Sequence, residues 1–354
     1  MSLINEITQQ LDSLENHGIV KQIHGHFYYV EELKSFLHGS ERNRLLQTKE
    51  ELLPLTLPTR LKKEKVEAYV GDIVELSQEN KIIKSVFKRL SLLSRPKVAN
   101  VDLAVIVVSS GDPPLESEYL DRLLCHSGLT LPLQPLICIT KSNTFSPPGI
   151  LKEYEDLGYT IVKVSNKTKY GIEELKNLLL NKTSVFAGQS GVGKSSLLNS
   201  LFPELNLKVG EVSSKSLRGT HTTRHTQIFD GSFNGQLFHI LDTPGFSRLD
   251  SQFTPFEIAD FRAFPEIALK KTSCQFNDCK HLEEEGCAVR FTESRKASYR
   301  KIMEEAKQYE EDQSQTYTKE RRESIKSDSN TTIPKLKASY RTTSRKKRKQ
   351  DFDY

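Results

Sequence analysis

A glycine-rich stretch near the middle of the chain has the residue types and spacing that bind phosphate. Residues 188–195 read GQSGVGKS and fit the pattern G-x-x-x-x-G-K-[ST]. An apolar run precedes the stretch and a helix-like run follows it, so backbone N–H groups of the loop would meet phosphate at a helix N-terminus. We expect Lys194 to reach the β- and γ-phosphates and Ser195 to offer its hydroxyl to Mg²⁺. The expected loop consists of Gly188, Gln189, Ser190, Gly191, Val192, Gly193, Lys194, Ser195 and Ser196.

A second motif follows downstream and supports the first. Apolar alternation over residues 237–241 predicts a strand that ends in DTPG, which resembles the DxxG element of GTPases. In that element Asp242 holds Mg²⁺ through water and the N–H of Gly245 senses the γ-phosphate. The polar segment RGTHTTRH lies between the two motifs and is typical of a switch loop, in which Thr222 or Thr223 ligates Mg²⁺ when a triphosphate is bound. This spacing disfavours the alternative that the first motif is only a glycine-rich turn.

The segments expected to read a nucleotide base come before the phosphate loop. Short apolar runs at 103–110 and 136–143 predict buried parallel strands, and a third strand is predicted over 160–166. The second run ends at the place of a guanine-reading N-K-x-D motif, and the third ends in a stretch similar to the S-A base contact. The candidate base-binding residues are Thr140, Lys141, Ser142, Asn143, Ser165 and Asn166. An amphipathic helix predicted over 171–180 leads back to the phosphate loop, so the domain is expected to be circularly permuted.

Three thiols and one imidazole gather within fourteen residues near the C-terminal end of the chain. The set consists of Cys274, Cys279, His281 and Cys287. It suits one tetrahedral Zn²⁺ per chain, in a structural site because four protein ligands leave no open position. The alternative is a group of cysteines without metal. The remaining thiols, Cys125 and Cys138, lie on apolar stretches and are expected in the core. Five cysteines used in this way indicate a reducing compartment.

Composition is consistent with a cytoplasmic protein of two or three domains. The chain has 354 residues, 36% of them apolar, and a net charge of +5. Residues 1–18 are polar and include acidic side chains, so they predict neither a signal nor a transit peptide. No apolar run approaches the roughly 20 residues that cross a bilayer, and no membrane partner is expected.

Sequence patterns at both ends of the chain are compatible with binding to nucleic acid, and each has an alternative interpretation. Residues 18–30, 67–76 and 81–90 predict short strands of a small barrel, either an OB-fold that binds RNA or a barrel without a ligand. Residues 31–65 are expected to form an insertion or a long loop. From Lys335 to Lys349 there are eight basic residues and no acidic one, after a predicted helix that frays over 304–330. This tail is either a solvated terminus or a salt-sensitive contact with phosphate backbone.

The order of these motifs, together with SLLSRPKVANVDLAVIVVS at residues 91–109, resembles the ribosome small-subunit-dependent GTPase A family from about Gly18 to about Gln308. The resemblance implies an α/β P-loop GTPase domain, circularly permuted, at residues 93–262. An N-terminal OB-fold β-barrel at residues 1–92 and a mainly helical zinc-binding domain at residues 263–354 would flank it. It further implies a monomer that hydrolyses GTP to GDP, stimulated by the 30S subunit, and contacts 16S rRNA late in small-subunit maturation.

Two departures from the family pattern bear on activity. Phe246 follows DTPG where many GTPases place a glutamine that orients the attacking water, and no histidine lies between Gly245 and His281 to take that role. His221 is a candidate by proximity only. The alternative hypothesis is therefore a zinc- and RNA-binding assembly factor that binds nucleotide with little turnover. The second departure is Asn143 in place of the guanine-selecting aspartate, which predicts weaker selectivity for guanine.

Overall fold

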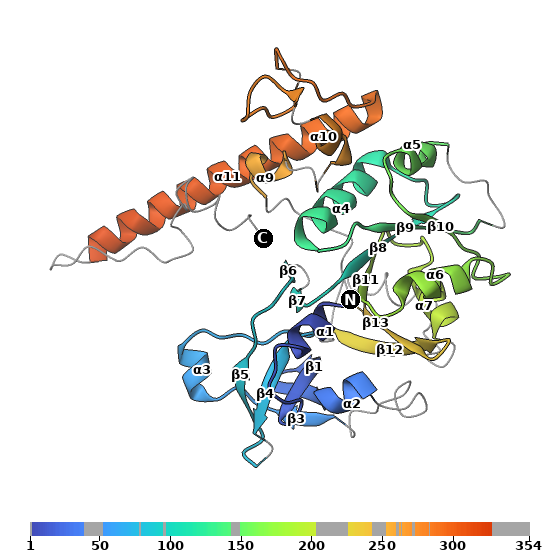
Figure 1. The fold of residues 1–354 in the computed structure, drawn as a ribbon. Coiled ribbons are helices and arrows are strands. Elements are labelled where there is room, and N and C mark those ends of the chain that lie inside the picture. The colour runs from blue at the N-terminus through green and yellow to red at the C-terminus, as the bar shows by residue number, and fades with distance from the viewer. Residues whose placement is uncertain are drawn as a thin grey trace.

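The computed structural model describes residues 2–38, 52–77, 79–94, 97–142, 149–202, 226–242, 253–259, 262, 264–270, 273–282 and 284–327. Three parts follow one another in space: a small barrel, an α/β domain and a lobe that includes a long helix (Figure 1). Some predicted features lie outside the described residues: Asn143, His221, Thr222, Thr223, Gly245, Phe246 and the basic stretch from Lys335 to Lys349.

A mostly parallel sheet forms the centre of the α/β domain. Its strands are β8 (Leu103–Ser109), β9 (Leu136–Thr140), β10 (Ile161–Lys163), β11 (Thr183–Ala187), β12 (Gln227–Phe233) and β13 (Gln236–Asp242). Their order is β10-β9-β8-β11-β13-β12, and only β12 runs antiparallel to its neighbour β13. The predicted apolar runs are confirmed as strands, and β8, β9 and β11 are buried along their full length, as expected for a sheet covered on both faces.

Helices cover both faces of this sheet because successive side chains of a strand point to opposite faces. The odd-numbered apolar residues of β8, from Leu103 to Val107, pack in one core with α6 (Ile172–Leu179) and α7 (Lys194–Leu201). The even-numbered residues pack in the other core with α4 (Ser117–Thr130) and α5 (Leu151–Asp156). This arrangement brings the carboxyl ends of the parallel strands to one edge, where ligands of such sheets bind.

Five short strands form the N-terminal barrel: β1 (His17–His24), β2 (Phe27–Glu32), β3 (Leu53–Leu55), β4 (Ile73–Ser77) and β5 (Ile82–Val86). They pair antiparallel in the order β3-β2-β1-β4-β5, and a parallel bridge between Thr56 and Ile82 closes the ring. Helices α1 (Leu3–Thr8), α2 (Leu33–His38) and α3 (Thr59–Lys63) accompany the barrel. The two-stranded sheet of β6 (Leu92–Ser94) and β7 (Lys97–Ala99) follows it.

The prediction of a loop or insertion over residues 31–65 is partly wrong, because this stretch contains a barrel strand. β3 pairs with β2 through Tyr28, Tyr29 and Val30. It is only three residues long and has Pro54 at its centre, so it carries no periodic pattern. Proline is tolerated there because it needs to donate no ladder hydrogen bond at such a position.

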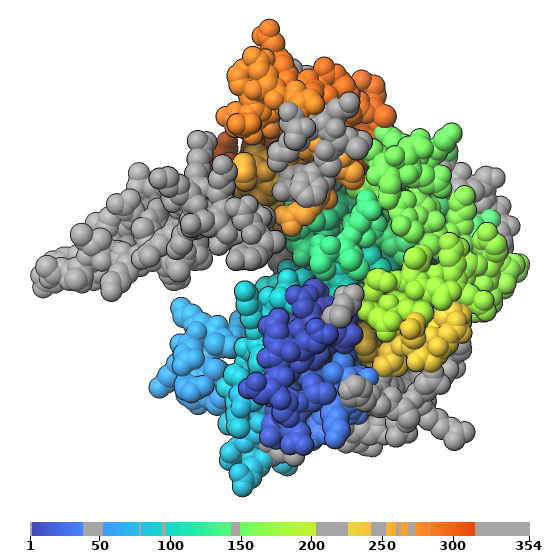
Figure 2. Space-filling model, in the orientation of Figure 1, coloured from blue at the N-terminus to red at the C-terminus, as the bar shows by residue number. Residues whose placement is uncertain are grey.

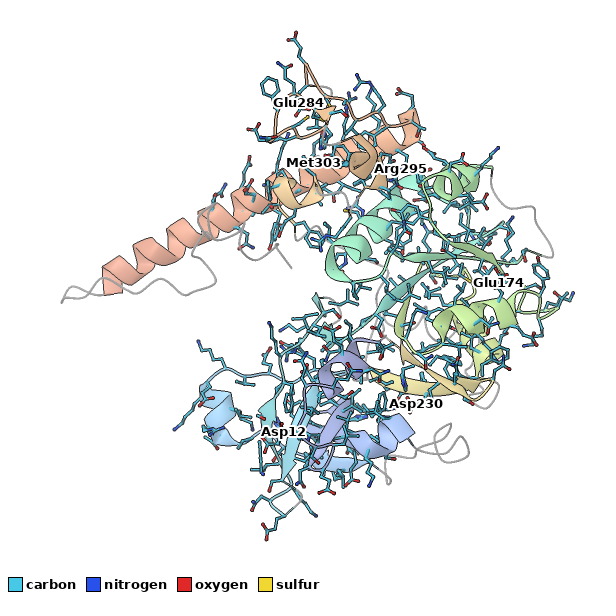
Figure 3. All side chains as sticks on the ribbon, viewed as in Figure 1. Asp12, Glu174, Asp230, Glu284, Arg295 and Met303 are labelled. Atoms are coloured by element: carbon cyan, nitrogen blue, oxygen red, sulfur yellow. The ribbon has the colours of Figure 1, made fainter. Side chains whose placement is uncertain are left out.

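The barrel and the central sheet meet at a buried cluster of charges. The Lys21 ammonium of β1 lies 2.5 Å from Asp230 Oδ2 on β12 and 3.4 Å from Glu31 Oε2 on β2. His239 Nδ1 on β13 lies 2.7 Å from Asp230 Oδ1, and the imidazole stacks on the Phe36 ring with centroids 4.2 Å apart. Burial alone would raise the pKa of Asp230, but Lys21 and His239 outweigh it and hold that pKa well below its usual range. Figure 3 shows Asp230 at this junction.

We expect Lys21→Met to destabilise the protein by about 3–5 kcal/mol, because it leaves two buried carboxylates without their cation. The control is Lys84→Met: Lys84 lies 3.4 Å from Glu75, but both side chains are well exposed, so the expected loss is at most about 1 kcal/mol. Urea unfolding of both variants measures the difference. Equal losses would show that the cluster contributes no more than a surface pair.

The C-terminal lobe packs against α4. Its helices are α9 (Pro255–Ile258), α10 (Pro265–Lys270) and α11 (Glu293–Ser327). The lobe core combines Phe264, Tyr299 and Met303 with Cys125 of α4. The predictions that Cys125 and Cys138 are core residues are confirmed, since they are 2% and 0% exposed. The space-filling view shows the lobe seated on the α/β domain (Figure 2).

A buried arginine joins the lobe to α4. Arg295 on α11 is 1% exposed and forms ion pairs with Asp121 of α4 and Glu266 of α10. Tyr154 of α5 donates its hydroxyl hydrogen to Asp121 at 2.7 Å, which ties a second helix of the α/β domain to the same centre. Within the described residues, no helix combines the length and the apolar character needed to cross a membrane.

Candidate functional site

The phosphate-loop sequence forms the connection between β11 and α7, as predicted. Gly188 leaves the strand so close to β8 that a Cβ atom there would meet the carbonyl oxygen of Val107 at 2.2 Å. Gly191 and Gly193 have φ values of +83° and +96°, which favour glycine. Gly193 is also the N-cap residue of α7, directly before its first residue. The glycine positions of the motif are therefore required by backbone geometry, and the loop ends at the positive end of a helix dipole.

Lys194 reaches back over this loop. Its ammonium donates hydrogen bonds to the carbonyl oxygens of Gly188 and Gln189, each at 2.7 Å. Burial lowers the pKa of Lys194 to about 8, because the charged form loses hydration without gaining an anionic partner. A cation held in this position by backbone carbonyls alone is suited to a phosphate oxygen. Ser195 and Ser196 follow in the first turn of α7 and are both partly exposed.

The DTPG element begins beside the phosphate loop. β13 runs parallel to β11, with Leu241 in register with Val185. Asp242 is the last residue of β13, so it stands at the same edge of the sheet as the end of β11. The strand register thus brings the backbone of Asp242 to the phosphate loop. The structure describes no side-chain contacts for Asp242.

The candidate base-binding segment after β9 is tied to the phosphate loop by two side chains. The Thr140 hydroxyl lies 2.5 Å from the carbonyl oxygen of Val192 and 3.1 Å from that of Val108. The Lys141 ammonium donates to the carbonyl of Gly191 at 3.2 Å and also to that of Asp112. The contact of Thr140 with Val192 joins residues 52 positions apart in the sequence, and that of Lys141 with Gly191 joins residues 50 positions apart. They bring the predicted base and phosphate segments together in one site.

The segment after β10 completes this side of the site. Ser142 donates its hydroxyl hydrogen to the carbonyl of Val164 at 2.9 Å, and Ser165 Oγ accepts from the N–H of Thr168 at 3.1 Å. Asn166 lies next to the phosphate loop: its Nδ2 is 3.7 Å from the point where a Cβ atom of Gly193 would stand. The described members of the predicted base-binding set are therefore neighbours in space.

The four predicted metal ligands converge at one point of the lobe. Their ligand atoms, in Cys274, Cys279, His281 and Cys287, all lie within 4.8 Å of one another. His281 Nδ1 is 3.7 Å from Cys287 Sγ and 3.8 Å from Cys274 Sγ. Separations of this size agree with a tetrahedral ion about 2.0–2.3 Å from each nitrogen or sulfur ligand. The donor set therefore fits a metal ion.

Sequence reasoning missed Glu284, which supports this cluster. Its carboxylate accepts hydrogen bonds from the N–H groups of Leu282 at 2.8 Å and Lys280 at 3.0 Å, on either side of His281. Glu284 is labelled in the C-terminal lobe in Figure 3. A carboxylate that closes the loop between metal ligands is a frequent support in such sites. The sequence gives only weak evidence for this role, because Glu284 is the middle one of three consecutive glutamates at 283–285.

The phosphate loop lies at the edge of a parallel sheet and follows the base-side strands in the sequence. This order defines a circularly permuted P-loop GTPase fold. The family model described as RsgA GTPase matches residues 86–252. A model described as 50S ribosome-binding GTPase matches residues 183–323, starting where β11 starts.

Relatives extend the match beyond the GTPase domain. The chain is 40% identical over 266 residues to the small ribosomal subunit biogenesis GTPase RsgA of Trichormus variabilis, covering 72% of this chain and 70% of that one. Identity to the protein of the same name in Bacillus subtilis is 35% over 283 residues, covering 77% and 88%. The chain belongs to the RsgA GTPase family, as the motifs predicted.

Two solved structures share the fold. The crystal structure of YjeQ from Thermotoga maritima matches with a TM-score of 0.62 and 29% identity, over 82% of this chain and 98% of that one. The structure of YloQ, described as a circularly permuted GTPase, matches with a TM-score of 0.63 and 29% identity, over 82% and 95%. The predicted fold class, a permuted GTPase domain between an OB-fold barrel and a metal-binding lobe, is confirmed.

Proposed function

We propose that this chain binds GTP at the loop of residues 188–196 and hydrolyses it to GDP and phosphate during maturation of the 30S ribosomal subunit. The observation that carries the proposal is the junction of the phosphate loop with the base-side segments, made by Thr140 and Lys141. Relatives that are 35% and 40% identical to the chain bear the name small ribosomal subunit biogenesis GTPase. We place the action of the protein in the cytoplasm, as a monomer that contacts 16S rRNA.

The residues of the site take complementary roles in this proposal. Lys194 pairs with the β- and γ-phosphates, and Ser195 with Asp242 holds the Mg²⁺ that accompanies GTP. One of Thr222 and Thr223 would join the ion in the triphosphate state, and the N–H of Gly245 would sense the γ-phosphate. Mg²⁺ supplies charge neutralisation across the phosphates when bound. Hydrolysis by such a site depends mainly on positioning and electrostatics, which a rigid loop between β11 and α7 favours.

The Cys₃His cluster holds one structural Zn²⁺ in this proposal. Three thiolates and one imidazole form the donor set that zinc prefers, and four protein ligands leave no position for a substrate. The N–H of Ala288 lies 3.4 Å from Cys274 Sγ, which favours the thiolate form that a metal needs. Zinc would hold together a loop of the lobe that has few apolar residues of its own.

Phosphate release from GTP, measured with and without purified 30S subunits, tests the proposal. We expect slow release by the protein alone and a severalfold or greater increase with the subunits. The second candidate function is a zinc- and RNA-binding assembly factor with little turnover, favoured by Phe246 in place of a water-orienting glutamine. Subunit binding without any increase in phosphate release would favour that second function.

A further inference from the structure

The hairpin of β12 and β13 connects the two segments that are predicted to respond to the γ-phosphate. β12 begins at Gln227, shortly after the predicted switch loop of residues 218–225, and β13 ends at Asp242, the first residue of DTPG. Gln227 pairs with Asp242 across the hairpin. Both segments therefore join the hairpin at the same end, and the position of that end decides where the Asp242 backbone stands beside the phosphate loop.

The N-terminal barrel continues the sheet of this hairpin, since β12 lies between β13 and β1 (Figure 1). Gln22 of β1 pairs with the same Gln227, so one row of paired residues runs from the barrel to Asp242. One apolar core also crosses the boundary, because it contains both Phe36 of α2 and Leu241 of β13. A displacement of the hairpin relative to the barrel would therefore break a strand pairing and open a packed core.

Lys21 is the charged side chain that holds the hairpin to the barrel. Val20 and Gln22 pair with consecutive residues of β2, so Lys21 is the extra residue of a β-bulge. A bulge re-aims the side chain that it inserts, and here the ammonium meets Asp230 of β12 and Glu31 of β2. Lys21 is 3% exposed, so removing it costs far more than removing one partner of a surface ion pair.

The cluster around Lys21 acts on both strands of the hairpin at a distance from the nucleotide site. Asp230 of β12 pairs with His239 of β13, and their side chains also contact each other. This pair lies three positions along each strand from the pair of Gln227 and Asp242, which corresponds to about 10 Å. Lys21 can therefore influence the site only through the position of the hairpin.

We propose that Lys21 is a positioning residue for the Mg²⁺ that accompanies GTP, and that it acts by holding the hairpin of β12 and β13 against the barrel. This inference rests on the proposed function, in which Ser195 and Asp242 hold that ion. A hydroxyl in the first turn of α7 and a carboxylate at the end of the neighbouring strand are oxygen donors of the kind that Mg²⁺ takes.

The geometry of the site separates the binding of Mg²⁺ from the binding of phosphate. Mg²⁺ requires nearly ideal octahedral geometry, with ligands at about 2.0–2.1 Å, and its two proposed protein ligands lie on different elements. A shift of the hairpin relative to α7 therefore weakens the ion. The phosphate loop depends less on the hairpin, because Lys194 is held by the carbonyl oxygens of Gly188 and Gln189 in the same loop.

The test is calorimetric titration of the full chain with the non-hydrolysable GTP analogue guanylyl imidodiphosphate, with saturating MgCl₂ and in Mg²⁺-free buffer. The ratio of the two affinities measures the contribution of the ion. In Lys21→Met this ratio should fall about tenfold or more, since a misplacement of about 1 Å can cost up to about 100-fold. Affinity in Mg²⁺-free buffer should stay nearly unchanged. Asp230→Asn, which leaves Lys21 paired with Glu31, should show a smaller fall of the same kind and perturbs the fold less.

Arg295→Met is the matched control for loss of stability. Arg295, like Lys21, is a buried cation between two carboxylates, but it joins the lobe to α4. Its removal should destabilise the protein by a similar amount, because it also leaves two buried carboxylates without their cation. The ratio of affinities with and without Mg²⁺ should stay at the value of the unmodified protein, since Arg295 does not contact the hairpin.

Hydrogen exchange provides a second readout, because a coupling between two sites acts equally in both directions. If the junction positions the Mg²⁺ ligands, filling the ion site must in turn stabilise the junction. Adding MgCl₂ to the complex with the analogue should therefore slow exchange of backbone N–H groups in β1 of the unmodified protein. The same addition should have little effect on β1 in Asp230→Asn.

Two results would overturn the inference and leave the proposed function intact. An unchanged ratio in both Lys21→Met and Asp230→Asn would mean that the hairpin keeps its position without the cluster. An equal fall of the ratio in Arg295→Met would mean that the ion responds to any loss of stability. A different result, in which the unmodified protein fails to bind the analogue or binds it equally with and without Mg²⁺, would contradict the proposed function itself.

Discussion

Lys194→Ala is expected to abolish tight nucleotide binding, with GDP affinity falling about 100- to 1,000-fold. The phosphate loop holds the Lys194 ammonium over the loop backbone, 2.7 Å from each of two carbonyl oxygens. Hydrogen bonds to charged groups contribute about 1.5–3 kcal/mol each, and this side chain would reach two phosphates. Calorimetric titration with GDP measures the loss. Phosphate release in the presence of 30S subunits should fall to background.

Ser195→Ala is the companion variant, because it removes only a hydroxyl at the start of α7. It should keep part of the nucleotide affinity and lose turnover, since Mg²⁺ would lose a ligand. Subunit-stimulated hydrolysis at the unmodified rate in either variant would show that these residues are assigned wrongly.

The pH dependence of binding provides a second readout of the same lysine. Burial lowers the pKa of Lys194 to about 8 in the free protein. Below that pH the ammonium is already charged, so binding requires no proton. Above it, binding must first protonate the amine, and affinity should fall by up to about tenfold per pH unit. Titrations with GDP between pH 7 and 9 should show this decline in the unmodified protein and a flat profile in Lys194→Ala.

Loss of one metal ligand is the change with the second largest expected effect. Cys279→Ser should reduce zinc from one ion to well below one ion per chain and loosen the lobe around it. Zinc binding contributes about 10 kcal/mol or more to the folding of small metal domains, and the cluster lies in a loop with few apolar residues. Metal analysis and hydrogen exchange of residues 273–291 measure the two effects. Nucleotide affinity should be nearly unchanged, because the ligands are confined to the lobe.

Cys125→Ala is the matched control for this experiment. Cys125 is a thiol of the same lobe core but not one of the four ligands. It should retain the metal while lowering stability by the small amount expected for a trimmed core side chain. If the unmodified protein, purified without chelator, contains no zinc, the assignment of the metal is wrong.

Much of the fold could be predicted because its strands are continuous apolar runs and its motifs are local in sequence. The phosphate loop and the Cys₃His cluster each fall within a short stretch, so their spacing alone indicated their chemistry. β3 escaped prediction because three residues with a central proline have no periodicity. The sequence of α4 also shows no clear apolar stripe of helical period, because Asp121, His126 and Ser127 lie on its buried side. The burial of these polar residues is explained only by the residues that pack against them in the folded protein.

Contacts between distant segments could not be predicted from spacing. Lys21 and Asp230 are 209 positions apart, and Arg295 and Asp121 are 174 apart. Each of these charged residues would ordinarily be placed on the surface. The domain boundaries at residues 92/93 and 262/263 stay predictions.

The attachment of α11 to α4 makes this helix a lever. It has 35 residues, which corresponds to about 50 Å at the usual helical rise, and it projects beyond the rest of the molecule (Figure 1). Its fulcrum is the buried Arg295 near its first turn, fastened to a helix that packs on β8 and β9. A rotation of α4 by about 6° would therefore move the far end of α11 by about 5 Å. A small displacement at the sheet edge would be several times larger at the far end of α11.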